Sequence, residues 1–378
     1  MVSFVYSFMI SLAAALVVRD QAPQPLELTL NKVPNLEAVQ PNPRNRAKPG
    51  PQDVELFAAA ASYQIDLGVI NEDQKVRVVL DTGSADLWVD AEKLSNTNGF
   101  TKTGESFAIG YGDRSTTRGD FGKSSVFLEN GLEVKDFQWA LATEVTLTGG
   151  SQNGILGIGK VTNEAGYHRT GKTYPNFTQK LKDQGTITSN SYSYFLNKDH
   201  DHDGTITFGG RDNKKVKGPV ATFHPSESDE YSRFDTVTVA KFTTSDGKTV
   251  QGFEAALDTG TTLTYIPIST LRELAIPGVY TNWQGQYYVD CNQPTDKYVS
   301  FWFNDVEIKL SYKDLAVPAY TINNQPSGTC FFAFQATGGE NLLGDSFLRH
   351  AYITVNHDKN EILVSNVEYT DEKDIVAI

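Results

Sequence analysis

The sequence predicts an all-β protein made of two related lobes, and three observations support this. Charged residues make up 21% of the 378-residue chain and aromatic residues 11%, so the chain can bury a large core. From residue 58 onward, short segments alternate apolar and polar residues and end at glycine, asparagine or aspartate, which is typical of strands. One pair of motifs also occurs in both halves of the chain, whose length exceeds that of an ordinary single domain.

Strand-like alternation is clearest in four segments: Tyr63–Val69, Lys75–Leu80, Glu105–Ile109 and Gly204–Phe208. One short amphipathic helix is expected after Pro175, with Phe177 and Leu181 on its apolar face and an end at Gly185. Asn176 begins an Asn-Phe-Thr sequon at the start of this helix. In an exported protein, this position predicts glycosylation of Asn176.

The N-terminus is apolar from Val2 to Val18, and Arg19 is its first basic residue. Because this run is short and interrupted by serines, we interpret residues 1–18 as a cleaved signal peptide rather than a membrane anchor, although a positive n-region is lacking. The C-terminal residues are mostly polar and do not form a lipid-anchor signal. We therefore expect a secreted, extracellular protein without a membrane partner.

Residues 21–52 contain seven prolines, a density that opposes helix interiors and central strands. Arg44, Arg46 and Lys48 form a basic cluster in this segment, ahead of an acidic remainder of the chain. Two interpretations stay open on charge alone. The segment is either a flexible leader or a pro-segment that docks on acidic groups of the mature protein.

The formal net charge is −13, from 33 basic and 46 acidic residues. Such a surface repels phosphate backbones and argues against nucleic-acid partners. It is compatible both with an ordinary soluble surface and with a protein that works in acid. The two cysteines, Cys291 and Cys330, are 39 residues apart and are either free thiols or, after export, a disulfide. A disulfide there would contribute about 3–4 kcal/mol in the chain-entropy model.

An internal repeat is the most informative feature of the chain. Residues 78–84 read Val-Val-Leu-Asp-Thr-Gly-Ser, and residues 255–261 read Ala-Ala-Leu-Asp-Thr-Gly-Thr. A second landmark follows each copy: Gly-Ile-Leu-Gly at 154–157 and Asn-Leu-Leu-Gly at 341–344. Two unrelated landmarks in the same order, 76 and 86 residues after their aspartates, indicate two related β lobes.

Each copy of the repeat places an aspartate where a buried strand turns. A single Asp-Thr-Gly is ordinarily a turn in which the aspartate accepts local hydrogen bonds. The matched pair instead suggests that Asp81 and Asp258 meet between the lobes. We expect threonines to bond across the interface, glycines to permit a tight backbone, and hydroxyls to donate to each carboxylate. The supporting residues are Thr82, Gly83 and Ser84 in the first copy and Thr259, Gly260 and Thr261 in the second.

Two carboxyls a few ångströms apart cannot both ionise cheaply, so they share a proton over an acidic range. Asp81 and Asp258 are therefore candidate catalytic residues for amide hydrolysis. One carboxylate would take a proton from water while the other carboxyl hydrogen-bonds the scissile carbonyl oxygen. This chemistry requires no metal, cofactor or covalent intermediate.

These motifs carry a family resemblance. Residues 80–89 look like the first active-site motif of the pepsin-like aspartic proteases, and residues 256–262 look like the second. The form resembles that of secreted fungal members such as the candidapepsins, and the similarity runs from about Ala59 to Tyr369. It implies two β-barrel-like lobes around a central substrate cleft, assigned here to residues 58–225 and 226–378. It also implies a monomer that takes protein and peptide substrates and pepstatin-type inhibitors.

Residues 109–113 are similar to the family's flap, the hairpin that closes over substrate. The resemblance implies that Tyr111 is the flap tyrosine and Trp88 its hydrogen-bond partner, with Gly112 and Asp113 at the tip. A half-buried strand aromatic is the alternative for Tyr111. Arg114 stands where family members often have glycine, which leaves the shape of the flap tip open. Thr262 is assigned to substrate binding.

Asp113 resembles the flap residue of members that accept lysine beside the scissile bond. It could equally be a solvated turn aspartate that Arg114 neutralises. Both interpretations stay open.

The family also implies that Cys291 and Cys330 form the single disulfide of the C-terminal lobe. It further implies synthesis as a zymogen, which favours a pro-segment at residues 19–57 and self-cleavage near the apolar pair Leu56 and Phe57. Subsite specificity, the natural substrate, the pH optimum and the processing sites stay open.

Other interpretations explain less of the sequence. A catalytically inactive pepsin-like binding or inhibitor protein usually lacks an aspartate or its support, whereas both motifs are intact here. A glycosidase also uses two carboxylates but gives no reason for the repeat. Residues 199–204 imitate a calcium loop, but Gly210 stands where the bidentate acid is required, so we predict a polar hairpin and no metal.

Overall fold

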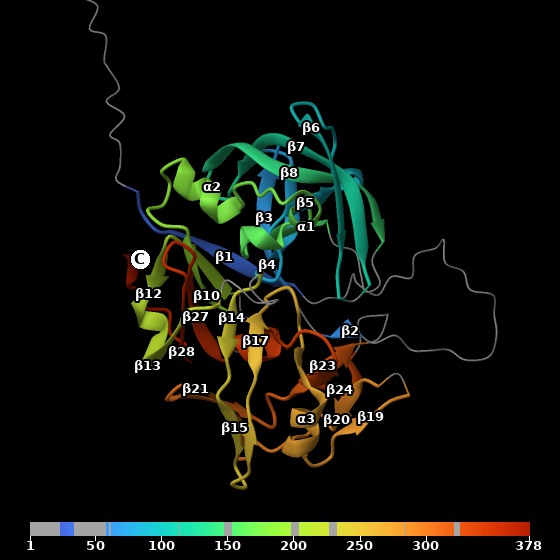
Figure 1. The fold of residues 1–378 in the computed structure, drawn as a ribbon, viewed down its shortest axis with the longest axis vertical. Coiled ribbons are helices and arrows are strands. Elements are labelled where there is room, and N and C mark those ends of the chain that lie inside the picture. Colours follow the sequence, from blue (N-terminus) through green and yellow to red (C-terminus); the bar gives the residue numbers. More distant parts are fainter. Residues whose placement is uncertain are drawn as a thin grey trace, which may run out of the picture.

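The computed structural model describes residues 23–33, 58–59, 62–112, 114–146, 153–197, 204–226, 233–283, 285–320 and 326–378. Strands dominate these residues, which confirms the predicted all-β class (Figure 1). All four segments with strand-like alternation lie in strands. Several predictions fall outside the described residues: the signal peptide, the basic cluster, the Leu56–Phe57 junction, Asp113 and residues 199–203.

The strands of the N-terminal half are β1 (Leu26–Val33), β2 (Ala58–Ala59), β3 (Ser62–Val69), β4 (Lys75–Asp81), β5 (Leu87–Asp90), β6 (Thr101–Gly110), β7 (Thr116–Phe127), β8 (Glu133–Thr146), β9 (Gly154–Gly157), β10 (Ser191–Phe195), β11 (Gly204–Phe208), β12 (Gly210–Asp212) and β13 (Val216–Phe223). Those of the C-terminal half are β14 (Thr236–Thr238), β15 (Lys241–Thr244), β16 (Thr249–Gln251), β17 (Glu254–Leu257), β18 (Thr264–Pro267), β19 (Tyr280–Thr281), β20 (Tyr287–Val289), β21 (Tyr298–Phe303), β22 (Val306–Ser311), β23 (Ala316–Tyr320), β24 (Pro326–Phe332), β25 (Phe334–Thr337), β26 (Leu342–Leu343), β27 (Ala351–Asn356), β28 (Glu361–Val367) and β29 (Ile375–Ala377).

The helices are short: α1 (Tyr167–Thr170), α2 (Phe177–Asp183), α3 (Ile268–Leu274), α4 (Asp345–Leu348) and the 3-10 turns η2 (Ala91–Lys93), η3 (Val161–Asn163) and η4 (Asn213–Lys215). No helix in the described ranges is long and apolar enough to cross a bilayer.

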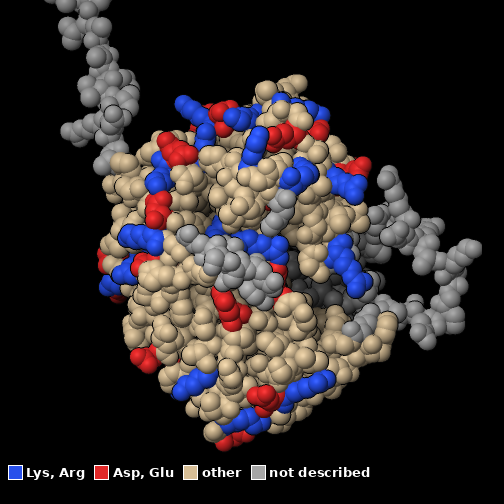
Figure 2. All heavy atoms as spheres, in the orientation of Figure 1, with Lys and Arg blue, Asp and Glu red and all other residues tan. Residues whose placement is uncertain are grey.

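The strands form two lobes, one above the other in Figure 1, with β3–β9 in the upper lobe and β14–β26 in the lower. A 13-stranded sheet runs in the order β13-β28-β27-β10-β11-β1-β3-β4-β9-β5-β8-β7-β6. Strands β27 and β28 come from the C-terminal half of the chain but pair with β10 and β13 of the N-terminal half. The large sheet therefore connects the two halves. Side chains of both charges are scattered over the face shown in Figure 2.

The internal repeat corresponds to a repeated strand topology. In the first lobe, β4 pairs in parallel with β9, and β9 pairs antiparallel with β5. In the second lobe, β17 pairs in parallel with β26, and β26 pairs antiparallel with β18. Leu80 thus faces Leu156 as Leu257 faces Leu343. Each Asp-Thr-Gly motif therefore leaves its sheet at the end of a buried strand, beside its own second landmark.

Strand β1 is an interior strand, although it lies in the predicted pro-segment. It pairs antiparallel with β11 on one side and with β3 on the other. Leu28 and Leu30 are buried in the core. The proline-rich segment therefore begins with an ordered strand, which proline density alone did not predict.

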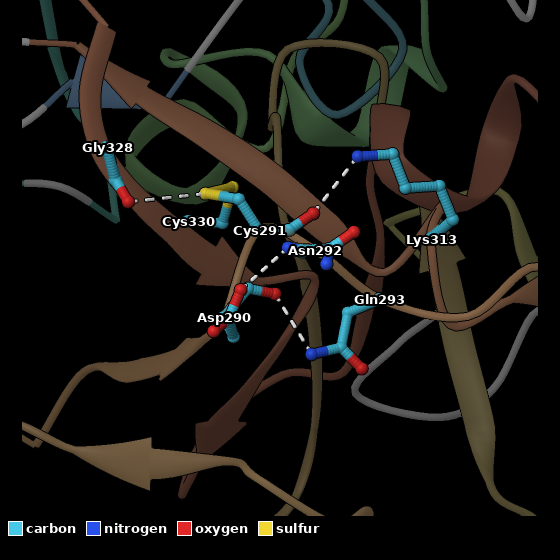
Figure 3. Close-up of a disulfide and its surroundings, with 7 residues drawn as sticks. All are labelled: Asp290, Cys291, Asn292, Gln293, Lys313, Gly328 and Cys330. Atoms are coloured by element: carbon cyan, nitrogen blue, oxygen red, sulfur yellow. Dashed lines mark hydrogen bonds between the residues drawn. A yellow bond between two sulfur atoms is a disulfide. The ribbon is translucent and has the colours of Figure 1, made fainter.

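Cys291 and Cys330 form a disulfide with their Cα atoms 5.2 Å apart, as the resemblance implied (Figure 3). Cys330 lies in β24, and Cys291 follows β20, which pairs with β24. Lys313 Nζ donates to the carbonyl oxygen of Cys291 at 3.0 Å. The bridge thus joins neighbouring strands of the C-terminal lobe.

The predicted helix after Pro175 is present as α2, but its sequon is not at the surface. Asn176 caps the helix: its Oδ1 accepts from the Gln179 amide at 3.0 Å. Its Nδ2, the atom that would carry a glycan, donates to the Gly159 carbonyl at 2.6 Å, and the residue is 0% exposed. A glycan would remove this hydrogen bond and has no space in the fold. The structure therefore argues against the glycosylation predicted for Asn176.

Candidate active site

Asp81 ends strand β4, and its carboxylate is held by the turn that follows. The Gly83 amide donates to Oδ1 at 2.8 Å, and Ser84 Oγ donates to Oδ2 at 2.5 Å. Asp81 is only 5% exposed. Both oxygens are thus oriented by groups within three residues of the aspartate.

Asp258 follows strand β17 and is held by matching bonds. The Gly260 amide donates to Oδ1 at 2.9 Å, and Thr261 Oγ1 donates to Oδ2 at 2.6 Å. Asp258 is 9% exposed. The second loop therefore repeats the hydrogen bonds of the first loop, with a threonine hydroxyl in place of the serine hydroxyl.

The two loops are joined by Thr82 and Thr259, as the sequence predicts. Thr82 Oγ1 donates to the Leu257 carbonyl and Thr259 Oγ1 donates to the Leu80 carbonyl, both at 2.8 Å. Each hydroxyl also accepts from the backbone amide of the other threonine, at 3.0 and 3.1 Å. Four buried hydrogen bonds thus tie the ends of β4 and β17 together.

This connection brings the carboxyls into contact. A Cβ atom at Gly83 would lie 2.8 Å from Asp258 Oδ1, and one at Gly260 would lie 2.6 Å from Asp81 Oδ1. Each glycine therefore makes room for the carboxyl of the opposite lobe. The two carboxyls therefore face each other between the loops.

Burial raises the pKa of both aspartates above the ordinary value, and the charge of Asp258 raises that of Asp81 further. Hydrogen bonds from the two loops oppose this change but do not cancel it. Two buried carboxyls in contact retain a proton where isolated aspartates are ionised. The pair can therefore act as acid and base together.

A second layer of acidic residues supports the first loop, and the sequence analysis did not identify it. Asp86 is 1% exposed and accepts hydrogen bonds from the Ala165 amide at 2.7 Å and the Tyr174 hydroxyl at 2.6 Å. Burial raises the pKa of Asp86 to about 6. The one available signal was an acidic residue inside the otherwise apolar segment 85–89.

Glu164 lies beside Asp86 and is also 1% exposed. Its carboxyl accepts from the Tyr174 amide at 3.0 Å. Burial, with the nearby Asp86, raises the pKa of Glu164 to about 9. Asn163, the residue before Glu164, donates from Nδ2 to the Gly83 carbonyl at 2.6 Å. Segment 163–165 is therefore attached to the loop that carries Asp81.

The second loop is supported by backbone groups at the start of α4. The Asp345 amide donates to the Thr261 carbonyl at 2.8 Å, and the Ser346 amide donates to the Thr262 carbonyl at 2.9 Å. Thr262 is thus placed next to the loop that carries Asp258.

The β6–β7 hairpin carries the residues assigned to the flap. Trp88 Nε1 donates to the Tyr111 hydroxyl at 2.6 Å, the contact that the resemblance implied. The Arg114 amide donates to the Tyr111 carbonyl, which closes the turn, and Gly112 is exposed. Arg114 has φ 71°, the left-handed conformation that glycine adopts without strain. Arg114 therefore has a positive φ, which is a conformation that suits glycine better than arginine.

Two buried aspartates on related β lobes, joined by reciprocal threonine bonds, define the geometry of an aspartic protease. Comparisons with known proteins agree. The family model "Eukaryotic aspartyl protease" matches residues 62–367. Candidapepsin-3 of Candida albicans (strain WO-1) is 34% identical over 355 residues, which covers 86% of this chain and 84% of the relative. The acid protease of Saccharomycopsis fibuligera is 31% identical and covers 81% of each.

A solved structure supports the fold. The crystal structure of an aspartic proteinase from Irpex lacteus matches with a TM-score of 0.69 at 20% identity, over 82% of this chain and 95% of the other. The chain therefore belongs to the eukaryotic aspartyl protease family and is an aspartic-type endopeptidase with the bilobal pepsin-like fold.

Proposed function

We propose that this protein is a secreted endopeptidase that hydrolyses peptide bonds of proteins at acidic pH, with Asp81 and Asp258 as the catalytic residues. The observation that carries the proposal is the matched pair of buried carboxyls, each held by an amide and a hydroxyl of its own loop. A catalytically inactive member of the family would have no need for this complete arrangement.

In the proposed mechanism, the pair holds one proton and binds a water molecule between its carboxyls. The ionised carboxylate takes a proton from this water as the oxygen attacks the scissile carbonyl carbon. The protonated carboxyl meanwhile hydrogen-bonds the carbonyl oxygen. When the C–N bond breaks, a proton passes from the pair to the leaving nitrogen and the shared proton is restored. Tyr111, fixed by Trp88, would position the flap over the substrate.

Acid dependence follows from the raised pKa values of the pair. As pH rises and the last shared proton leaves, the acid function is lost and two buried carboxylates repel each other. We therefore expect activity to fall as the pH approaches neutrality.

We further propose that the chain is made as a zymogen, with residues 19–57 as its pro-segment. Strand β1 supports this, because a pro-segment that forms an interior strand is bound tightly in the precursor. The relatives include a "Secreted aspartic protease 3", which supports export. N-terminal sequencing of the secreted chain before and after acid treatment tests both points. A new N-terminus near Phe57 is expected, and processing only after the basic cluster would contradict cleavage at this junction.

The catalytic proposal is tested by cleavage of denatured haemoglobin or casein from about pH 2 to about pH 7, with and without pepstatin. Asp81→Asn should abolish cleavage, as should pepstatin. The control is the wild-type chain carried through the same processing. If folded, correctly processed wild type cleaves nothing at any pH, the family's binding-protein alternative replaces this proposal.

Acceptance of lysine beside the scissile bond is a separate proposal, made through Asp113. Rates on lysine- and phenylalanine-containing peptides should be compared in wild type and Asp113→Ala. A selective loss on lysine peptides is expected, and an equal loss on both would remove the proposal.

A further inference from the structure

The turn of the β6–β7 hairpin carries a positive charge that the proposed catalytic mechanism does not use. Arg114 is exposed and lies in this turn, between Tyr111 and the start of β7. Its amide donates to the Tyr111 carbonyl at 2.9 Å, and the Tyr111 amide donates to the Ser115 carbonyl at 2.9 Å. The backbone of Arg114 is therefore fixed in the same turn as Tyr111.

Tyr111 connects this turn to the strands that lead to Asp81. Its hydroxyl accepts from Trp88 Nε1 at 2.6 Å, and Trp88 faces Ile155 of β9. Strand β9 pairs with β4, which ends at Asp81. The base of the turn is thus anchored beside the candidate catalytic pair, and Arg114 lies at the exposed end of the hairpin.

The backbone conformation of Arg114 is costly for a residue with a side chain. Its φ of 71° lies in the left-handed region, which residues with a Cβ atom adopt infrequently and glycine adopts freely. Residues held in such conformations are concentrated at functional sites, where the side chain is kept despite the strain. The strain at Arg114 therefore points to a use for its guanidinium group.

That guanidinium group has no acidic partner in the described part of the chain. Neither a hydrogen bond nor an ion pair joins the Arg114 side chain to another residue there. Arg118 of β7 faces Glu144 of β8 without forming an ion pair with it. Arg169 of α1 donates from Nη2 to the Ser106 carbonyl of β6 at 2.9 Å rather than to a carboxylate. The surroundings of the turn therefore carry positive charge that is not neutralised locally.

The acidic residues that the structure describes on β6 and β7 lie away from the turn. Asp120 pairs with Lys102 at 2.6 Å, and Glu105 lies near the middle of β6. Asp113, which precedes Arg114, is outside the described residues. In a protein with a net charge of −13, this end of the hairpin is therefore a local exception, at a place where a substrate would lie.

We propose that Arg114 is a specificity-determining residue that favours substrates with a carboxylate side chain, aspartate or glutamate, close to the scissile bond. The inference rests on the proposed function, in which the hairpin closes over the substrate. A guanidinium group can bind a carboxylate through two parallel hydrogen bonds, an arrangement that neither an amide nor an ammonium group reproduces. Arg114 supplies this group at the exposed end of the hairpin.

The expected size of the preference follows from the exposure of Arg114. An exposed ion pair contributes little in open solvent, but water excluded between hairpin and substrate strengthens it. We expect about a fivefold preference in kcat/KM for glutamate over glutamine at the substrate position that Arg114 contacts. A lysine at that position should be cleaved more slowly than glutamine, because like charges repel. Faster cleavage of the lysine peptide there would mean that Asp113 decides the preference, and would overturn the proposal.

The test uses peptides that differ only by glutamate, glutamine or lysine at one of about six positions around a common scissile bond. The kcat/KM of the processed wild-type protein is measured at about pH 5.5, where a substrate glutamate is ionised. A preference for glutamate at one position or at two adjacent positions is expected. Equal rates for glutamate and glutamine at every position would overturn the proposal.

Three variants assign the preference to Arg114. Arg114→Gln removes the charge and should bring the glutamate-to-glutamine ratio to about 1, while Arg114→Lys keeps the charge and should retain about a twofold ratio. Arg118→Gln is the matched control, since it removes another exposed arginine of the same hairpin, and it should leave the ratio at about fivefold. A ratio that survives in Arg114→Gln, or that falls equally in Arg118→Gln, would contradict the assignment.

Salt and acid distinguish a charge preference from a preference for shape. The ratio should fall to about twofold between about 0.02 and 0.5 M salt, because ions screen an exposed pair. It should approach 1 at about pH 3, where the substrate glutamate is protonated. Because the two peptides are compared at the same pH, the pH dependence of catalysis itself cancels in the ratio. A ratio that changes with neither condition would rule out recognition of the carboxylate charge.

Binding of non-hydrolysable peptides separates this inference from the proposed function. Hydroxyethylene analogues of the glutamate and glutamine peptides are titrated into the processed wild-type protein and into Arg114→Gln by calorimetry. The Kd of the glutamate analogue should be about fivefold lower in the wild type and about equal to that of the glutamine analogue in the variant. This difference in a protein that cleaves nothing would count against the proposed function only. Equal Kd values in the wild type would overturn the role of Arg114.

Discussion

The two Asp-Thr-Gly loops hold their carboxyls with the same hydrogen bonds but are supported by different chemistry. Behind the first loop, Asp86 binds the Ala165 amide and the Tyr174 hydroxyl. The residue at the same distance after the second aspartate is the apolar Leu263, and that loop rests on backbone amides of α4. The geometry of each carboxyl is therefore set by its motif. The response of each loop to pH depends on the residues that its own lobe packs behind it.

The lobes also differ in covalent support. The only disulfide of the chain lies in the C-terminal lobe, since no cysteine precedes Cys291. The N-terminal lobe relies on its core and on buried polar contacts. Mutations should therefore affect the two lobes differently.

Replacing both cysteines, by Cys291→Ser with Cys330→Ser, should have the largest effect on stability. A cross-link over 39 residues contributes about 4 kcal/mol in the chain-entropy model. Hydrogen exchange measured by mass spectrometry should show the loss of protection concentrated in strands β19–β24. An equal loss in strands β3–β9 would mean that the lobes unfold as one unit.

The threonine bonds should be equally important in the two lobes. Thr82→Val and Thr259→Val each leave buried backbone groups without a partner, which costs about 1–3 kcal/mol. The two substitutions remove different hydrogen bonds, but all four bonds hold the same junction between the ends of β4 and β17. Once one substitution has loosened this junction, the second should cost less, so the double variant should lose clearly less than the sum of the two single variants. Denaturant unfolding measures the free energy of unfolding of the two single variants and the double variant. Additive losses would show that the two bonds act independently.

The acidic support of the first loop should make that loop sensitive to pH. The pKa of Asp86 is raised to about 6, so its contribution is complete below its unfolded value of about 4 and is lost as pH rises through 6. Asp86→Asn should therefore flatten the fall of Tm between about pH 4 and 6. It should lower Tm somewhat below pH 4, since one hydrogen bond is lost.

Glu164→Gln tests the second acidic residue of this loop. The pKa of Glu164 is raised to about 9, so its contribution to stability is lost between about pH 4 and 9. The substitution should flatten the fall of Tm over that range. The control is Leu263→Ala, which destabilises the second loop without introducing or removing a charge. It should lower Tm by a similar amount at every pH. A wild-type pH profile in Asp86→Asn would mean that Asp86 does not titrate in this range.

The smallest change is expected from a substitution in the flap, which belongs to the first lobe, and it concerns activity. Tyr111→Phe removes the hydrogen bond from Trp88 but keeps the ring, a loss of about 1 kcal/mol or about fivefold in kcat/KM. Tyr280→Phe, at an exposed tyrosine of the second lobe, is the control and should change nothing. An unchanged kcat/KM in Tyr111→Phe would show that the bond does not position the flap for catalysis.

The parts of the site that the two copies of the Asp-Thr-Gly motif carry could be predicted from the sequence. The Asp-Thr-Gly repeat predicted the two aspartates, the threonine bonds and the two related lobes, because each motif carries its own donors. The resemblance to pepsin-like proteases added the disulfide and the Trp88–Tyr111 contact, which are separated in the chain.

Features that depend on the path of the chain are visible only in the folded protein. Asn176 follows the glycosylation pattern, yet packing against residues 158–159 buries its side chain. Asp86 meets Tyr174 and Asp235 meets His357 across 88 and 122 residues. The only local signal is the apolar segment around Asp86, because burial and pairing arise only when distant strands pack together and exclude water.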